Sequence, residues 1–340
     1  MNTIKDKIIG IYDRITSTGL GRTLMTLVVV GVFALLPSVI KGNYWVRILD
    51  SAGIYIMLAL GLNVILGYTG LLHLGFAANF AIGAYMWGLL GSPQYDIHWN
   101  FWVVFLLAGL VSGIFGYLLA IPALNLKGDY LALVTIGFGE SVRIFLNNSE
   151  LTMSAIGIIG IDPMTVGPIV MKSVTDYYYV ILAICVLIAF LMRRLENSRL
   201  GNAWMAIRED EMAAESMGLD TRNLKLFANF IGAIPAGFAG VVFAALQTYV
   251  SPVSFKFIES ITILSMVVVG GRANVYGVIL GAILLTVAPE PLRGSDFETA
   301  RILIYGVLLV VMMLFRPEGI WVRKSGKTKP PKLEQNKVCD

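Results

Sequence analysis

The chain has 340 residues, of which 57% are hydrophobic and only 14% are charged, and its formal net charge is +4. Soluble domains carry about a quarter charged residues, so this composition excludes an ordinary soluble protein and predicts an all-α, polytopic helical membrane protein. Two cysteines and two histidines are too few for a disulfide framework, a metal site or a Ser/His/Asp centre. We therefore expect no metal, no cofactor, no nucleic-acid partner and no enzymatic activity in the chain itself.

The chain starts with a basic segment, residues 1–22, which we expect on the cytoplasmic side. Apolar runs then follow that are each long enough to cross a hydrocarbon layer about 30 Å thick. They form a transmembrane domain over 23–320, and a basic cytoplasmic tail over 321–340 is expected to be disordered. We expect about ten transmembrane segments, with boundaries near 23–40, 47–66, 71–90, 101–122, 130–146, 177–192, 225–249, 258–270, 275–289 and 301–315.

Basic residues set the orientation of these segments. The two richest basic clusters lie in the loop 193–225 and in the tail, and ten crossings place both clusters and both termini in the cytoplasm, as the positive-inside rule requires. The eighth segment is short and ends at two glycines, so a re-entrant pair over 258–289 is an alternative with the same sidedness. The long outer segment 147–176 divides the chain five plus five, the arrangement of an inverted repeat.

A charged, helix-prone element lies within the loop 193–225. Residues 203–217 contain no Pro or Gly, while Asn202 is placed to cap the start of a helix and Gly218 to end it. Small side chains on one face would admit another surface closely, and the acidic edge would supply directional contacts. A solvated connector that lies on the membrane is the alternative interpretation.

Five stretches, taken in chain order, resemble one family. They are GYTGLLHLGFAANFAIGAY at 67–85, KGDYLALVTIGFGESVRIFLNN at 127–148, GNAWMAIREDEMAAESMGLDTRNLKLFANFIGAIPAGFAG at 201–240, YVSPVSFKFIESITILSMVVVGGRANVYGVILGAILLTVAPEPLR at 249–293 and FRPEG at 315–319. They resemble the permeases of ATP-binding-cassette (ABC) importers, and most closely the branched-chain amino acid permeases of the LivM type, in the high-affinity hydrophobic amino acid uptake family. The resemblance covers most of residues 45–320.

The resemblance implies the ABC importer permease fold in the cytoplasmic (inner) membrane of a prokaryote, with ATP hydrolysis left to partner subunits. The implied partners are a second permease subunit in a heterodimer, two ABC ATPase subunits, an extracytoplasmic substrate-binding protein, membrane lipid, and leucine, isoleucine or valine as cargo. In this family the acidic, Ala-rich helix couples the permease to the ATPase. That role falls here on Ala206, Arg208, Glu209, Asp210, Glu211, Ala213, Ala214 and Gly218.

Broken or short segments at matching positions of two repeats point to a transport site, and the third segment of each half fits this description. The translocation pathway is therefore expected at Gly70, His73, Gly75, Asn79, Glu140, Ser265, Gly270 and Gly271. Arg143 is three residues from Glu140, so an intrahelical pair with a purely structural role is the alternative. The chain departs from the family's pattern at His73, at Asn79, in LTMSAIGIIGID at 151–162 and in the GGRANVYG bend.

Three other functions compete with this interpretation. Urea or a short amide is a rival cargo within the same family. An ion-coupled secondary carrier would need carboxylates buried in the middle of a span, and only Glu140 comes near that description. A membrane-embedded enzyme would need a catalytic cluster, which the residue inventory lacks; even the SGKTK run at 325–329 lacks the upstream glycine and strand of a phosphate loop. A pore with few fixed charges suits a zwitterion, because burial of unpaired charge is costly.

Overall fold

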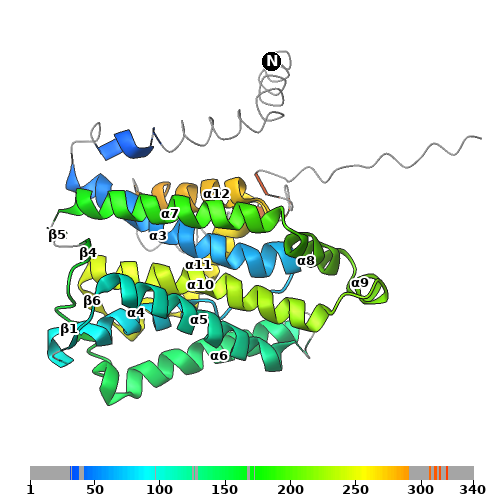
Figure 1. The fold of residues 1–340 in the computed structure, drawn as a ribbon, viewed down its shortest axis with the longest axis horizontal. Helices are drawn as coiled ribbons and strands as arrows, with labels where there is room; N and C mark the ends of the chain where they lie inside the picture. The colour runs from blue at the N-terminus through cyan, green and yellow to red at the C-terminus, as the bar shows by residue number, and fades with distance from the viewer. Residues whose placement is uncertain are drawn as a thin grey trace, which may run out of the picture.

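The computed structural model describes residues 31, 33–37, 42–95, 97–124, 126, 129–166, 169–171 and 173–290, together with single positions between 306 and 320. Its long helices run along one common direction (Figure 1). In chain order the α-helices are α3 Asn43–Leu62, α4 Ala77–Leu90, α5 Phe101–Ala123, α6 Asp129–Asn148, α7 Val174–Glu196, α8 Arg199–Glu209, α9 Glu211–Ser216, α10 Thr221–Gln247, α11 Phe257–Gly270 and α12 Val275–Val287.

Helix α10 forms the centre of the bundle and packs against α3, α4 and α5. Helices α7 and α12 cover α3 on one side, and α6 lies against α4 and α5 on the other (Figure 1). The contact between α10 and α4 is made through backbone, because a Cβ on Gly83 would lie 2.7 Å from the Cα of Gly237. Small residues at such crossings are typical of membrane helices, whose association depends on close packing.

The two ends of the bundle differ in structure (Figure 1). Short antiparallel strands lie at one end, where β3 Ile158–Ile159 pairs with β6 Tyr249–Val250, β1 Gly91–Ser92 with β2 Ile97–His98, and β4 Thr165–Val166 with β5 Ile169–Val170. Helices α8 and α9 lie at the opposite end. Under the expected topology the strand end is the outer face, and the α8–α9 end is cytoplasmic.

Four described segments are long and apolar enough to cross a membrane: Asn43–Tyr68, Phe101–Ala123, Val174–Glu196 and Thr221–Gln247. Capping groups fix several of their starts. The Asn100 side chain accepts a hydrogen bond from Trp102 N at 2.9 Å before α5, and the Asp220 side chain accepts one from Asn223 N at 3.0 Å before α10. These caps satisfy backbone N–H groups that a helix start leaves free.

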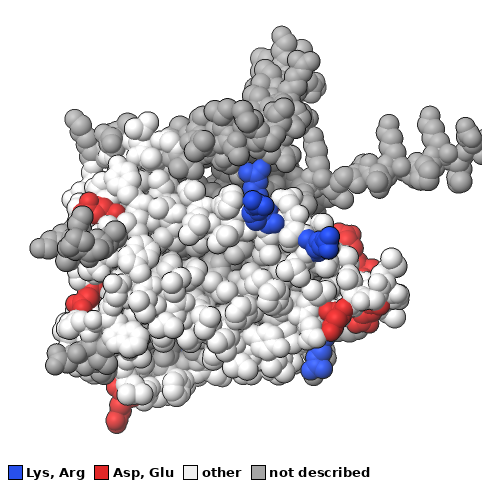
Figure 2. Space-filling model, viewed as in Figure 1, with Lys and Arg blue, Asp and Glu red and all other residues white. Residues whose placement is uncertain are grey.

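The surface between the two ends is apolar. Along α5, Leu106, Leu110 and Leu118 are 65%, 51% and 54% exposed. On the face shown in Figure 2, acidic side chains lie at the two ends, a few basic side chains lie between them toward the α8–α9 end, and most of the remaining surface is uncharged. Exposed apolar area of this extent marks a lipid or protein contact. The prediction of a polytopic helical membrane protein is therefore confirmed at the level of class.

Most expected segments match helices within a few residues, but the segment 71–90 does not. Its first part is not helical, and α4 begins only at Ala77. Helices α11 and α12 have 14 and 13 residues, about 20 Å at 1.5 Å per residue, which is shorter than the hydrocarbon layer. The expected segments 23–40 and 301–315 lie largely outside the described residues, as do the two terminal segments, so the count of ten and the inverted repeat stay predictions.

Candidate functional site

The chain leaves the α-helical conformation between α3 and α4. Helix α3 passes directly into a π-helix, η1 Asn63–Tyr68, and residues 70–75 that follow are neither helix nor strand. Gly70 has φ +74°, which an L-residue with a side chain rarely adopts. Non-helical backbone at membrane depth is tolerated where protein buries it or where it lines a cavity. We call residues 70–76 the broken segment.

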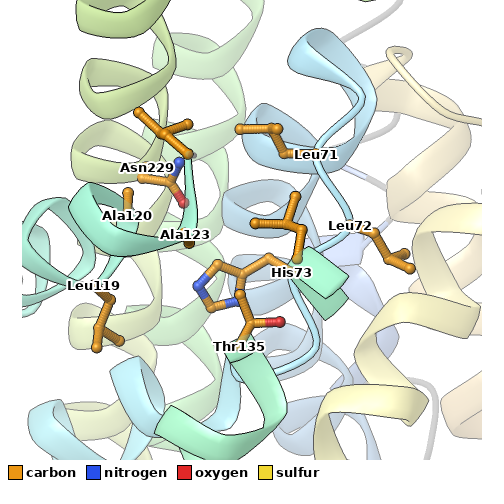
Figure 3. A pocket seen from close by; sticks show the side chains of 10 residues that line it. Leu71, Leu72, His73, Leu119, Ala120, Ala123, Thr135 and Asn229 are labelled. Carbon is orange, nitrogen blue, oxygen red and sulfur yellow. The ribbon is translucent and has the colours of Figure 1, made fainter. Parts of the chain in front are cut away.

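One cavity lies beside the broken segment at the end nearer to α8 (Figure 3). Its polar lining groups are His73, Thr135 and Asn229, which come from the broken segment, α6 and α10, and its remaining walls are Leu and Ala side chains. His73 is 5% exposed, and its Nδ1 has no hydrogen-bond partner among the described residues. We call this the His73 cavity.

A second cavity lies at the starts of two short helices, α4 and α11. It is lined by Leu74, Gly75, Ala77, Ile136, Gly139, Glu140, Phe255, Phe257 and Ser260. Ala77 N, in the first turn of α4, donates to Ser260 Oγ of α11 at 3.0 Å, so the two helix starts face each other. Both helices direct backbone N–H groups and the positive end of their dipoles toward this place. We call this the Glu140 cavity.

Glu140, which lines the Glu140 cavity, forms an ion pair within α6 with Arg143, which is not among the lining residues. Arg143 Nε donates to Glu140 Oε2 at 2.6 Å, and Phe257 N, in the first turn of α11, donates to Glu140 Oε1 at 3.3 Å. The two charged side chains are half-buried, 27% exposed for Arg143 and 31% for Glu140. Glu140 therefore joins α6 to α11 while Arg143 neutralises it.

The eight residues expected in the translocation pathway fall into two groups. His73, Gly75 and Glu140 line the two cavities, and Gly70 begins the broken segment beside them. The other four do not line either cavity: Asn79 is buried near Gly116 of α5, Ser265 bonds back to Ile261 O within α11, and Gly270 and Gly271 lie where α11 turns toward α12.

The charged element expected in the cytoplasm consists of two helices, α8 and α9, rather than the expected single helix 203–217. Asp210 has extended backbone (φ −155°, ψ 110°) and caps α9 by accepting from Ala213 N at 3.0 Å. The first helix starts earlier than expected, because Ser198 rather than Asn202 caps α8. Gly218 follows α9 with φ +84°, in agreement with the expected helix stop.

The residues expected to couple to an ATPase differ in accessibility. Glu211 forms an ion pair with Lys225 of α10, and Ala214 is only 4% exposed, so both are engaged within this chain. Met212 and Met217 are 77% and 85% exposed. The remaining expected residues are also exposed: Ala206, Arg208, Glu209, Asp210, Ala213 and Gly218. The accessible face of α9 therefore runs through Met212 and Ala213 rather than Ala214.

Helix α8 is bound to the start of the broken segment. Arg208 Nη1 donates to the carbonyl of Gly67 at 2.6 Å, and a Cβ on Gly70 would lie 3.2 Å from Arg208 Cγ. The rings of Trp204 and Tyr68 stack, with centroids 6.5 Å apart and planes 6° apart. Helix α8 thus contacts the end of η1 directly.

The turn between α11 and α12 meets the same region. Ala273, at φ +62°, donates its N–H to Asn63 Oδ1 at 2.9 Å. Further along the chain, Ile320 N donates to Val269 O at 3.0 Å, so this part of the C-terminal region lies beside the same turn. Asn63 therefore connects η1 to α11–α12 at the α8 end of the bundle.

Several polar residues of this region were missed by sequence reasoning. Thr135 and Asn229 line the His73 cavity, and Ser260 faces α4. Thr135 and Asn229 are each a single polar residue inside an apolar run, which was the available signal, whereas Ser260 directly follows Glu259. Asp50 is wholly buried in α3, and neither of its carboxylate oxygens has a hydrogen-bond partner among the described residues. The expectation that only Glu140 resembles a buried mid-span carboxylate was therefore wrong.

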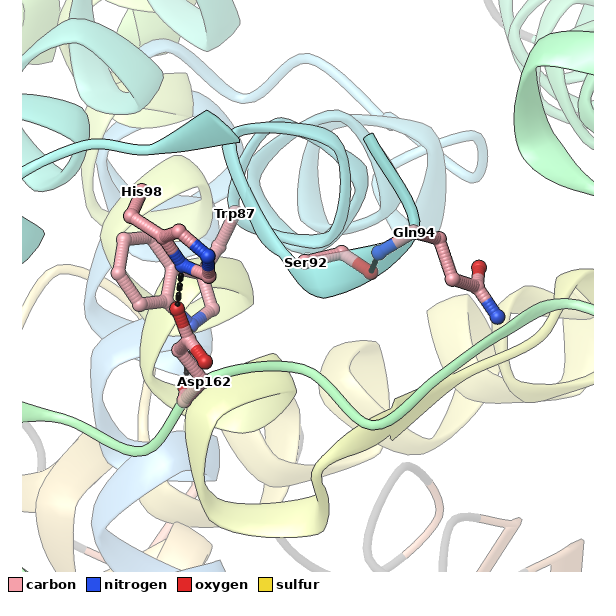
Figure 4. A network of polar contacts seen from close by, with 5 residues as sticks. All are labelled: Trp87, Ser92, Gln94, His98 and Asp162. Carbon is pink, nitrogen blue, oxygen red and sulfur yellow. Dashed lines mark hydrogen bonds and ion pairs between the residues drawn. The ribbon is translucent and has the colours of Figure 1, made fainter. Parts of the chain in front are cut away.

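At the strand end, a polar network joins Trp87, His98 and Asp162 (Figure 4). His98 Nδ1 lies 2.6 Å from Asp162 Oδ2, and Trp87 Nε1 donates to the carbonyl of Asp162 at 3.1 Å. Asp162 N in turn donates to Gly91 O at 2.7 Å. These contacts attach the segment after α6 to the end of α4.

Comparison with known proteins agrees with this architecture. Residues 44–312 match the family model described as "Branched-chain amino acid transport system / permease component". The chain belongs to this family, so it is a multi-pass membrane permease and not an enzyme.

Individual permeases are similar to this chain over most of its length. The chain is 44% identical over 321 residues to the high-affinity branched-chain amino acid transport system permease protein LivM of Salmonella typhimurium, covering 87% of this chain and 74% of the relative. It is also 44% identical over 291 residues to LivM of Escherichia coli, covering 78% and 67%. The autoinducer 2 import system permease protein LsrC of Yersinia pseudotuberculosis is 25% identical over 312 residues, covering 83% and 82%. No solved structure matches the chain.

Proposed function

We propose that the chain is the permease subunit of an ABC importer for leucine, isoleucine and valine, and that its α8–α9 element couples it to a separate ATPase. The observation that carries this proposal is the bond between Arg208 and the Gly67 carbonyl. It connects an exposed cytoplasmic element to the broken segment that borders both cavities. A solvated connector would need no such contact with the pathway.

The proposed mechanism is alternating access. Partner ATPases close on ATP and displace α8–α9, Arg208 and Trp204 transmit this displacement to η1, and the broken segment repacks between α6 and α11. Rigid-body movement of this kind changes contacts at a few hinges while the packed helices keep their cores. Residues 71–74 are suited to be such a hinge, because no hydrogen bond between main-chain groups holds them within the part of the chain that the structure describes.

Branched-chain amino acids are the best-supported cargo. The relatives that share 44% identity are named as permeases for these amino acids, whereas the relative named for autoinducer 2 shares 25%. The apolar walls of both cavities suit aliphatic side chains. Urea or a short amide would gain little from walls made mostly of Leu, Ile, Ala and Phe.

The remaining parts of the proposal concern organisation. We propose ten segments in two inverted halves, the terminal segments 1–22 and 321–340 in the cytoplasm, and a domain over 23–320 with its coupling loop at 193–225. A second permease subunit would complete the pathway, two ATPases would dock at α9, and an extracytoplasmic binding protein would deliver cargo at the strand end. The short α11–α12 pair supports the re-entrant alternative for 258–289.

Docking at α9 can be tested with Met212→Glu. Met212 is 77% exposed, and burial of a new unpaired carboxylate in an apolar contact should weaken ATPase binding by roughly tenfold or more. The measurement is the amount of ATPase that co-elutes with the permease, purified through a tag on this chain. Ile156→Glu is the matched control, since Ile156 is 71% exposed near the strand end and should leave co-elution unchanged.

Ala213→Trp is a second, uncharged variant of the same exposed face. It should obstruct docking sterically without adding charge, since a bulky ring does not fit a contact shaped for a methyl group. Normal co-elution and normal substrate-stimulated ATP hydrolysis in both Met212→Glu and Ala213→Trp would show that α9 is a solvated connector and would reject the proposed coupling.

A further inference from the structure

Within the described membrane-spanning helices, Glu140 and Arg143 form the one ion pair. The other two described pairs, His98–Asp162 and Lys225–Glu211, lie at the outer and cytoplasmic ends. A buried ion pair does not reliably stabilise a protein, because the free-energy cost of removing both charges from water can exceed their mutual attraction. The pair on α6 therefore invites a functional explanation, and its position at the Glu140 cavity supplies one.

The Glu140 carboxylate occupies a place that is built for a carboxylate. It receives a charged donor, Arg143 Nε at 2.6 Å, and a backbone donor, Phe257 N at 3.3 Å. The backbone donor belongs to the first turn of a helix of 14 residues, where the dipole also favours negative charge. A free carboxylate that entered from this cavity and took the place of the Glu140 carboxylate would meet the same two donors, once Glu140 had turned aside.

We infer that the Glu140–Arg143 pair is the binding site for the charged end of a zwitterionic amino acid, which exchanges with the pair. In the loaded site the α-carboxylate of the cargo takes the two donors that Glu140 now holds, Arg143 Nε and Phe257 N. The α-ammonium group takes the Glu140 carboxylate. No covalent bond forms or breaks, and no proton is transferred. This inference rests on the proposed function and names the groups that recognise its cargo.

Charge balance supports an exchange of this kind. When the site is empty, the carboxylate and the guanidinium neutralise each other; when it is loaded, each is neutralised by one end of the cargo. No charge is left unpaired at membrane depth in either state, and unpaired charge there would be costly. A cargo with a net charge, or with only one charged group, would leave one partner of the pair unmatched.

The walls of the same cavity match the other end of the cargo. Leu74, Ile136 and Phe255 line it and offer apolar contact to a branched aliphatic side chain. Gly75 and Gly139 lie back to back beside them, because a Cβ on Gly139 would be 2.9 Å from the Cα of Gly75. This contact between the broken segment and α6 leaves no room for side chains, so its separation would open the cavity during transport.

The test compares three ligands on the assembled transporter, purified without its soluble binding protein and reconstituted in nanodiscs. The ligands are L-leucine, L-leucinamide, which lacks the carboxylate, and 4-methylpentanoate, which lacks the ammonium group. Wild type should bind L-leucine about tenfold or more tightly than either analogue, as expected for the loss of one charge-assisted hydrogen bond. Equal affinity for the three ligands would overturn the inference.

Each single substitution of the pair should remove the preference for L-leucine over one of the two analogues. Glu140→Gln should abolish the advantage of L-leucine over 4-methylpentanoate, and Arg143→Gln should abolish its advantage over L-leucinamide. A merely structural pair predicts that each variant weakens all three ligands by the same factor, and that result would refute the assignment. The double variant Glu140→Gln/Arg143→Gln replaces both charges with amides and leaves no unpaired charge that could cause misfolding. It should bind the three ligands with equal affinity. A retained preference for L-leucine in this variant would also refute the assignment.

The outcome is separable from that of the coupling proposal. ATPase co-elution should be normal in the Glu140 and Arg143 variants, because the pair is on α6 and the proposed docking face is on α9. Loss of ligand discrimination with normal co-elution supports the site. Normal discrimination together with failed docking in the α9 variants would reject the coupling proposal alone.

Discussion

Arg208→Met is the most direct perturbation of the link between the cytoplasmic element and the pathway. In the native protein the guanidinium donates to the Gly67 carbonyl at 2.6 Å, while the aliphatic stem packs over Gly70. Methionine keeps an unbranched apolar stem of similar reach and removes the donor. The substitution therefore isolates the hydrogen bond from the packing that accompanies it.

The free energy lost in Arg208→Met depends on the kind of hydrogen bond that is removed and on its exposure to solvent. A hydrogen bond to a charged group contributes roughly 1.5–3 kcal/mol when it is buried. Arg208 is exposed in part, so water and salt screen the interaction, and we expect about 1 kcal/mol. Because 1.4 kcal/mol corresponds to about a tenfold change, the ratio of substrate-stimulated to basal ATP hydrolysis should fall about fivefold.

The assay is ATP hydrolysis by the reconstituted transporter, with and without loaded binding protein. Basal hydrolysis and co-elution of the ATPase should stay near wild type, since the bond to Gly67 is internal to this chain. Arg222→Gln, which alters an exposed arginine at the start of α10, is the control and should keep full stimulation. A wild-type stimulation ratio in Arg208→Met would refute the role of this bond in transmission.

Two further predictions concern the α11–α12 pair. Gly281→Ala should lower the thermal unfolding midpoint by several degrees, because its Cβ would collide with the Met266 carbonyl and overpacking costs roughly 1–3 kcal/mol. The control is Gly137→Ala, where nothing lies within 4 Å of the added Cβ, and it should leave the midpoint unchanged. Equal midpoints in the two variants would contradict the packing argument. Asn63→Leu removes the acceptor of the Ala273 N–H, and the loss of a partner for a buried donor costs about 1–3 kcal/mol. The substitution should increase hydrogen exchange in the turn 271–274. Unchanged exchange there would show that the turn does not depend on this bond.

The sequence predicts the long helices well because their signals are local. Apolar runs of more than twenty residues predict helices from composition alone, and the expected segment 101–122 matches α5, Phe101–Ala123. The expected start at 225 is four residues late, because α10 begins at Thr221 after the cap Asp220. Families of transporters share such helices, and the quoted stretches identify the family directly. Agreement at this level depends on the chain's own composition rather than on its tertiary contacts.

The departures from prediction have two causes, contacts with distant elements and local helix capping. The sequence 71–76 is as apolar as a helix, yet its backbone is held open by groups from other elements, such as Thr135 Oγ1, which accepts from Leu74 N at 3.1 Å. The single helix expected over 203–217 breaks at Asp210, whose side chain caps α9 instead of continuing the turn. Ala214 was expected on the docking face but is buried, 4% exposed, in the second of the two helices.

The two ends of the bundle are fastened by different kinds of bond, and this determines which end can move. At the strand end main-chain pairs add to the side-chain contacts of Asp162: β3 pairs with β6, and Gly160 N and Ile161 N both donate to Thr248 O at 3.1 and 3.2 Å. At the α8 end the connections are made largely by side chains, such as Arg208 and Lys225. Side chains can exchange partners by rotating about single bonds, whereas a main-chain ladder must be broken as a unit. We therefore expect the strand end to move little. A force applied at α8 should instead bend the half of the bundle nearer to α8.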